Sequence, residues 1–273
     1  MLVLLPDNRR MAALPETIPS RTPQPRNADR TCVFCDEHIA PGTPAEHVIP
    51  DWIRRLRPDG TVYQHKSKQP GVLTHRSKRI GITAKTVCRE CNHGWMSDLE
   101  TKASPILKPM IEGRLQGLSV EQQVLLSQWA TKTAFMLDQS FRPSERAVPV
   151  SACRYLKRYE LPPPGTVVQL GHYEGAGDFI ATTHNRLYAS KVAKREDPGP
   201  ADAFRAAMRI HRLVIGVTVI DGAPITVRAT GDYPDMLTTI WPSAEIASWP
   251  PGLAFDDRTW SGFMEPELPG GGR

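Results

Sequence analysis

Cys32-Val33-Phe34-Cys35 and Cys88-Arg89-Glu90-Cys91 are the two stretches that decide the fold of this chain. In each stretch two residues separate a pair of cysteines, which is the spacing of a metal-binding knuckle. Two such pairs supply four thiolates to one tetrahedral Zn²⁺ and leave no coordination position for a substrate. We therefore predict a structural zinc that ties the two stretches together. Cys153, the fifth cysteine, lies outside this pattern and is interpreted as a buried thiol.

Two further short motifs accompany the cysteine pairs. Glu46-His47-Val48-Ile49-Pro50 lies between the pairs, and Asn92-His93 directly follows the second pair. A CxxC pair, an EHxxP motif and a CxxCN motif that leads into a helix together resemble the HNH (His-Me finger) endonuclease family. The resemblance covers the chain from about Thr31 to Glu100. It implies a ββα-metal module on a zinc-bound, treble-clef-like scaffold, and metal-dependent cleavage of DNA.

The residue types in these motifs suit the hydrolysis of a phosphodiester bond. The reaction needs a base that removes a proton from water and a cation that neutralises charge on the phosphate and the leaving oxygen. His47 can be the base, because an imidazole of ordinary pKa is largely neutral at physiological pH. Glu46 and Asn92 carry hard oxygen atoms that suit Mg²⁺ or Mn²⁺, and the resemblance assigns both to the catalytic ion. His93 either substitutes for Asn92 or contacts phosphate, or it begins a helix and faces solvent.

One position departs from the family. Its members usually carry an Asn on the second strand, where it orients the catalytic His, but the corresponding stretch here, Ile82–Val87, contains no Asn. Thr83 or Lys85 is available for the orienting role. The departure also keeps a second function open, that of a non-catalytic zinc-finger DNA-binding or adaptor protein with a decayed HNH site. The acidic residue, the His and the closing Asn favour the enzyme, because a decayed site has no physical reason to keep all three.

The distribution of charge points to an anionic partner. The chain carries 34 Lys and Arg residues against 29 Asp and Glu residues, which gives a net charge of +5. Between Asp51 and Glu90, however, ten basic residues stand against three acidic ones. Basic side chains that meet phosphates release counterions and bind nucleic acid without regard to its sequence. DNA is therefore the predicted partner, and RNA is not excluded. The residues expected to contact the nucleic-acid backbone are Lys66, Lys68, Arg76, Lys78 and Arg79.

The second half of the chain predicts a helix followed by a mostly antiparallel sheet. Ser119 and Gln122 have the spacing of a capping box, and apolar residues recur at helical spacing from there to about Gln139. Another short helix is expected at 152–159. β-branched and aromatic runs predict strands at 166–173, 179–189, 208–220 and 225–230, with a hairpin turn at Asp221-Gly222 and a surface loop at 191–202.

We therefore expect an α+β protein in four parts. Residues 1–30 are rich in Pro, Arg and Asn without periodicity and are predicted to be a disordered leader. Residues 31–110 form the HNH nuclease module, and 111–247 form an α+β C-terminal domain of unknown role, for which a protein partner stays open. Residues 248–273 are predicted to be a flexible tail.

The composition is that of a globular protein, with 40% hydrophobic and 23% charged residues. No apolar run approaches the roughly 20 residues that a membrane-spanning helix needs. The apolar start at Met1–Leu5 has neither the basic beginning nor the length of a signal peptide. These features predict a cytoplasmic protein without a membrane partner, in which reduced cysteines favour metal binding over disulfides.

Overall fold

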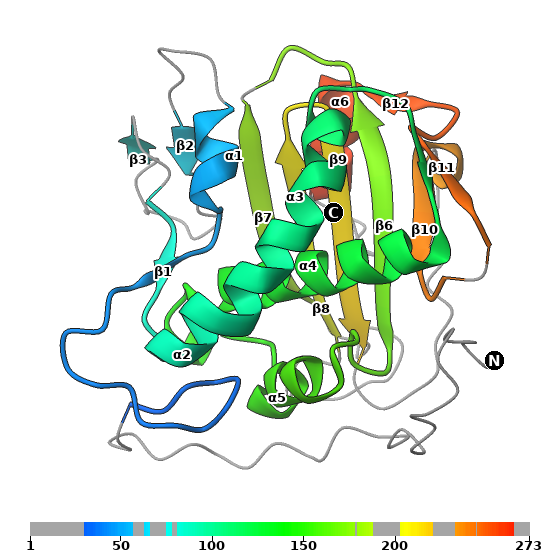
Figure 1. The fold of residues 1–273 in the computed structure, drawn as a ribbon. Coiled ribbons are helices and arrows are strands. Elements are labelled where there is room, and N and C mark those ends of the chain that lie inside the picture. Colours follow the sequence, from blue (N-terminus) through cyan, green and yellow to red (C-terminus); the bar gives the residue numbers. More distant parts are fainter. Residues whose placement is uncertain are drawn as a thin grey trace, which may run out of the picture.

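A computed structural model describes residues 30–56, 81–177, 179–187, 203–220, 233–243 and 245–264. It describes the backbone alone for 63–65, 75–77 and 185–187. The fold is α+β, as predicted, and is dominated by a curled, mostly antiparallel sheet with helices across one of its faces (Figure 1). In the described part of the chain no helix is long and apolar enough to cross a membrane.

The large sheet has the strand order β10-β6-β9-β8-β7. Its strands are β6 (Thr166–Tyr173), β7 (Ile180–Leu187), β8 (Ala203–Ile210), β9 (Leu213–Ile220) and β10 (Leu237–Trp241). All neighbours along this order are antiparallel. The short η4 (Pro234–Met236) leads into β10.

The prediction of a single strand at 208–220 is wrong. A turn at His211-Arg212 splits this stretch between β8 and β9, which pair as a hairpin from Ile210 opposite Leu213 onward. His211 has a φ of 51°, in the left-handed region that suits a tight turn. The polar side chains at the turn were the local signal for the break. The predicted hairpin at 221–222, the strand at 225–230 and the loop at 191–202 lie outside the described residues.

Helix α4 (Val120–Gln139) occupies the middle of the molecule. It begins at the predicted capping box, in which the Gln122 backbone N–H donates to Ser119 Oγ and the Ser119 N–H donates to Gln122 Oε1. Residues 129–139 are buried all round the helix, since α4 contacts β6, β8, β9 and β10 on one side and α3 (Ser97–Ile111) on the other. The fold therefore has three layers, namely the sheet, α4 and α3 (Figure 1). The short η2 (Pro143–Glu145) and α5 (Val150–Tyr159) follow α4.

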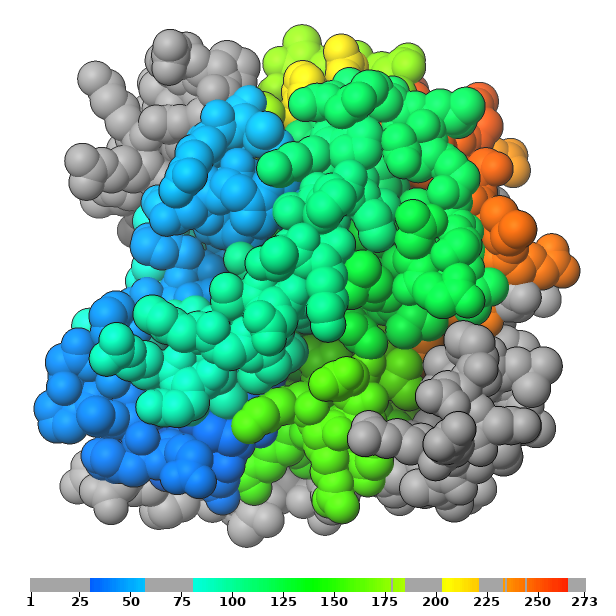
Figure 2. Space-filling view, in the orientation of Figure 1, coloured from blue at the N-terminus to red at the C-terminus, as the bar shows by residue number. Residues whose placement is uncertain are grey.

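The N-terminal elements are short. They are β1 (Glu46–His47), α1 (Asp51–Arg55), β2 (Tyr63–His65), β3 (His75–Ser77), β4 (Thr83–Ala84), α2 (Arg89–Cys91) and the π-helical turn η1 (Asn92–Met96). Among them β4 contacts α4 and η1 contacts α3. One apolar cluster runs from Cys32 through Ile53, Ala84 and Met96 and through α4 to Trp249. In the space-filling view the blue and cyan N-terminal segments form a continuous surface with the green segments that follow them (Figure 2). The division into domains at residue 110 stays a prediction.

The predicted flexible tail begins with ordered structure. β11 (Ala247–Trp249) pairs with β5 (Gln116–Leu118), β12 (Ala254–Phe255) pairs with β6, and α6 (Asp257–Met264) follows. Trp249 is fully buried, and its indole N–H donates to the Gly171 carbonyl at 3.1 Å. Phe255, Trp260 and Phe263 form a second apolar cluster with Tyr173. The prediction of a flexible tail is wrong for 248–264, because large apolar side chains of this Pro- and Gly-rich stretch are buried against the rest of the protein.

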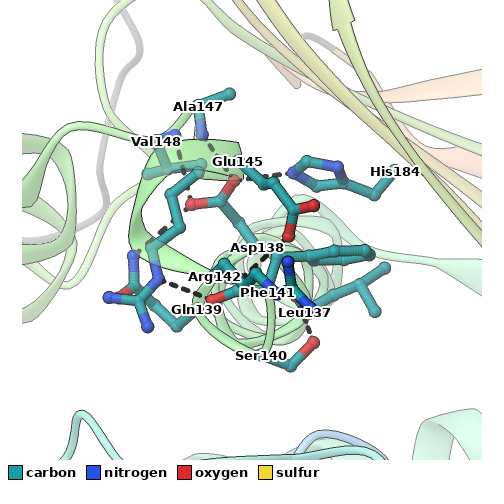
Figure 3. A network of polar contacts seen from close by, with 11 residues as sticks. Leu137, Asp138, Gln139, Ser140, Phe141, Arg142, Glu145, Ala147, Val148 and His184 are labelled. Atoms are coloured by element: carbon teal, nitrogen blue, oxygen red, sulfur yellow. Dashed lines mark hydrogen bonds and ion pairs between the residues drawn. The ribbon is translucent and has the colours of Figure 1, made fainter. Parts of the chain in front are cut away.

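A buried carboxylate fixes the C-terminal end of α4 (Figure 3). Asp138 has no exposed surface, and its Oδ1 lies 2.7 Å from both the Ala147 N–H donor and His184 Nε2. Its Oδ2 accepts from the Val148 N–H at 3.2 Å. Phe141 stacks on the His184 ring. The carboxylate therefore joins α4 to the loop at 147–148 and to strand β7.

Replacing this carboxylate should destabilise the whole fold. Asp138→Ala leaves two buried backbone N–H groups and the His184 ring without their acceptor, and we expect the free energy of unfolding to fall by about 3–5 kcal/mol. Urea denaturation measures this change in the free energy of unfolding. The exposed Lys102 on α3 provides a control, since Lys102→Ala should change the free energy by no more than about 0.5 kcal/mol. A loss of about 1 kcal/mol or less for Asp138→Ala would contradict this account.

Candidate functional site

The four predicted cysteine ligands come together in space. The sulfur atoms of Cys32, Cys35, Cys88 and Cys91 all lie within 4.8 Å of one another. Those of Cys35 and Cys88 are 3.5 Å apart. Three of the four side chains are buried and Cys35 is half-buried. Such a set of sulfurs can hold a metal ion such as zinc, in the tetrahedral arrangement that four thiolates favour.

Local backbone structure aims each pair of sulfurs inward. At the first pair, the Asp36 N–H donates to the Cys32 carbonyl, and Asp36 takes a left-handed φ of 68° that closes the turn. At the second pair, Cys88 caps α2, with its sulfur accepting from the Cys91 N–H at 3.4 Å. A hydrogen bond from the Val33 N–H to the Thr86 carbonyl at 2.9 Å joins the two stretches. These turns and hydrogen bonds therefore direct the sulfurs of both pairs toward one point.

Crowding of the sulfurs gives them very different acidities. The hydrogen bond with Cys91 lowers the pKa of the Cys32 thiol to about 4. Burial, together with the neighbouring sulfurs, raises the pKa of the Cys88 thiol to about 12. The same hydrogen bond, with burial, raises the pKa of Cys91. One thiolate therefore forms readily among the cysteines, and four can coexist only around a cation.

Cys153 takes no part in this cluster. It is fully buried on α5, and burial raises the pKa of its thiol. This agrees with the interpretation of the fifth cysteine as a buried thiol.

Strands β1 and β4 position the predicted catalytic pair. Glu46 lies opposite Ala84 and His47 opposite Thr83 in an antiparallel register. Because successive side chains on a strand point to opposite faces, Glu46 shares a face with the buried Ala84 and His47 shares a face with Thr83. Thr83, one of the two residues considered for orienting the imidazole, is therefore its direct cross-strand neighbour. Lys85, the other, is exposed.

Glu46 is brought against the start of the helix that follows the second cysteine pair. Its carboxylate is half-buried, and the side chain of Asn92, the residue after Cys91, lies near enough to act on its pKa. Burial raises the pKa of the Glu46 carboxyl, and Lys132 and Asn92 act in the opposite direction. Two of the predicted oxygen ligands are thus near each other.

His47 is half-buried and keeps access to solvent. Burial lowers the pKa of its imidazole, and the positive charge of Arg54 on α1 lowers it further. Arg54 also forms an ion pair with Asp51. The ring is therefore held in the neutral form that can accept a proton.

The remaining predicted residues are less well defined. His93 is exposed beside Asn92, so its three predicted roles stay open. Arg76 lies on β3 opposite Gln64 of β2, in a register taken from the backbone. The other residues predicted to contact nucleic acid lie outside the described part of the chain, and they are Lys66, Lys68, Lys78 and Arg79.

Sequence reasoning missed an ion pair next to Glu46. Lys132 of α4 is fully buried, and its Nζ lies 2.6 Å from Oε1 of Glu100 on α3. The available signal was Lys132 itself, because it falls three residues after the buried Trp129 and three before the buried Phe135, on a helix with no exposed side there.

Zinc should prove structural. We expect about one zinc per chain by elemental analysis, and Cys88→Ser should lose it and unfold the N-terminal elements, because the metal contributes folding free energy. Circular dichroism and hydrogen exchange follow the unfolding. Cys153→Ser is the matched control and should keep its zinc. A fully folded Cys88→Ser protein without zinc would overturn the structural assignment.

The titration of His47 tests its electrostatic surroundings directly. In NMR titrations of the protein without added Mg²⁺ or Mn²⁺, the His47 ring should protonate at a pH below the ordinary value of 6.5. Arg54→Gln removes a positive charge that disfavours the imidazolium, so the midpoint should move to higher pH. Arg55→Gln, at the exposed neighbouring position, should leave it in place. A midpoint above 6.5 in the wild type, or one that Arg54→Gln leaves unchanged, would count against this description.

Comparison with known proteins gives no further guide to this site, since no family model, curated protein or solved structure matches the chain.

Proposed function

We propose that this chain is a metal-dependent endonuclease of the HNH type that hydrolyses phosphodiester bonds in DNA. The observation that carries the proposal is that Glu46 and the solvent-accessible His47 lie side by side on β1, while Asn92, which acts on the Glu46 carboxylate, directly follows the cysteine cluster. These groups come from a strand and a helix start that the cysteine cluster holds together. An acid, an imidazole and an amide in this arrangement support a hydrolytic reaction on a phosphate.

Glu46 and Asn92 would hold a divalent ion of the Mg²⁺ or Mn²⁺ class. The fit lies in the donor set, because carboxylate and amide oxygens are the hard ligands that these ions prefer. When bound, the ion supplies positive charge that stabilises the phosphate and the leaving oxygen. The Asn92 amide, which acts on the Glu46 carboxyl, would direct its oxygen toward the ion.

His47 would act as the general base. Its lowered pKa keeps the ring neutral at physiological pH, so that one ring nitrogen can accept a proton from the attacking water. Thr83, opposite His47 on β4, is placed to restrict the ring in the role that an Asn has elsewhere in the family. The basic residues between 51 and 90 would bind the phosphate backbone on either side of the cleaved bond.

The absence of that Asn favours a second candidate function, a non-catalytic zinc-finger DNA-binding or adaptor protein. The two functions differ in what His47 does. An adaptor would bind DNA without cleaving it. In the enzyme, cleavage would depend on the His47 imidazole.

Plasmid nicking separates the two. With Mg²⁺ or Mn²⁺ added to the zinc-loaded protein, the wild type should nick supercoiled DNA, and His47→Ala should be slower by about 10²–10⁴-fold, the usual contribution of a general base. Gel-shift affinity for the same DNA should stay close to the wild-type value. His38→Ala removes an exposed imidazole that lies outside the EHxxP motif and should nick normally.

Nicking that survives His47→Ala undiminished would refute the assignment of the base. DNA binding by the wild type with no nicking under either metal would favour the adaptor.

A further inference from the structure

The buried ion pair between α4 and α3 is the starting point. Lys132 has no exposed surface, while the side chain of its partner Glu100 remains 20% exposed. A buried ammonium is costly unless it is paired, so the structure keeps a positive charge here for a reason beyond filling space. Met or Leu at this position of α4 would satisfy the surrounding apolar residues.

The pair is electrostatically joined to the proposed catalytic site. Glu46 shares a strand face with Ala84, and β4 contacts α4, so this face of β1 is directed toward the helix that carries Lys132. Lys132 and Glu100 both act on the Glu46 carboxylate, Lys132 more strongly than Glu100. Asn92 also acts on the Glu46 carboxyl and completes the group.

The group contains one basic side chain, Lys132, and two acidic ones, Glu100 and Glu46. Glu100 and Glu46 would repel each other in a partly desolvated setting if no cation lay near them. Lys132 is the cationic side chain at this place, with its Nζ 2.6 Å from Glu100. A divalent ion held by Glu46 and Asn92 would bring further positive charge close to the ammonium, and the two would repel each other.

We propose that Lys132 is a positioning residue that holds Glu100 and Glu46 together in the ion-free site and, by its charge, weakens the binding of the divalent ion. The inference rests on the proposed nuclease function. The site thus keeps its shape without the ion and takes it up with reduced affinity. Helix α4, which follows the HNH-like segment in the chain, is then part of the catalytic arrangement.

The test compares Mn²⁺ binding by zinc-loaded full-length variants, followed by the loss of the free-ion signal in electron paramagnetic resonance. Lys132→Met removes the positive charge and should bind Mn²⁺ about tenfold more tightly or better, since one charge has left the neighbourhood of a divalent ion. Lys132→Met with Glu100→Gln removes one charge of each sign and should return close to the wild-type affinity. Lys132→Arg keeps the charge and should also bind as the wild type does.

A second readout separates electrostatics from structural damage. In the nicking assay, Lys132→Met should lower the Mn²⁺ concentration needed for half-maximal rate. A merely structural role would lower the rate at saturating metal and weaken binding in the single and double variants alike. If Lys132→Met does not fold, Lys132→Gln provides the same loss of charge while keeping a hydrogen-bond donor for Glu100.

Unchanged or weaker Mn²⁺ binding in the folded Lys132→Met or Lys132→Gln protein would overturn the inference. The proposed nuclease function would still stand if the wild type binds Mn²⁺ and nicks DNA. A zinc-loaded wild type that neither binds Mn²⁺ nor nicks DNA would overturn both proposals.

Discussion

The convergence of four cysteine sulfurs is the constraint on which the N-terminal part of the molecule depends. These sulfurs belong to stretches far apart in the sequence, and they lie within 4.8 Å of one another in a buried setting. Sulfur atoms crowded in this way can all ionise only around a cation, so metal binding and folding are coupled. The same convergence sets the β1–β4 pair beside the first turn of the helix after Cys91. The proximity of Glu46 and Asn92 follows from that placement.

Helix α4 supplies the second constraint, through two buried charges at different points along its length. Lys132 is paired with Glu100 on α3, and Asp138 is paired with His184 and the loop at 147–148. Each charge is held by a partner from another element, because an unpaired buried charge would cost several kcal/mol. The helix is therefore fixed to α3 on one side and to β7 of the sheet on the other. Rigidity of this kind is what a site built from short strands and turns needs from its support.

Local signals in the sequence predicted much of this structure. The capping box at Ser119 marks the start of α4, and the strand at 166–173 has the predicted bounds, since both depend on neighbouring residues. The turn at His211-Arg212 was missed because it contains neither Gly nor Pro, and mostly apolar residues continue after it. The ordered segment at 248–264 was missed because its aromatic side chains are stabilised by contacts with strands distant in the sequence.

Within the candidate site, the CxxC spacing predicted which sulfurs meet, and the motif order selected Glu46 and Asn92. The pairing of Lys132 with Glu100 has no local sequence pattern, because it joins two helices that become neighbours only in the folded chain. A charged residue on the buried part of a predicted helix is the signal that was available. It identifies a residue that needs a partner but does not identify the partner.

Anomalous X-ray scattering from crystals of the His47→Ala protein soaked in Mn²⁺ tests the central claim most directly, because it locates the ion without relying on turnover. The account predicts a zinc peak among the four cysteine sulfurs and a separate manganese peak within coordination distance of Glu46 and Asn92, at about 2.0–2.3 Å from their oxygens. A manganese peak elsewhere, or none at these two side chains at saturating Mn²⁺, would contradict it.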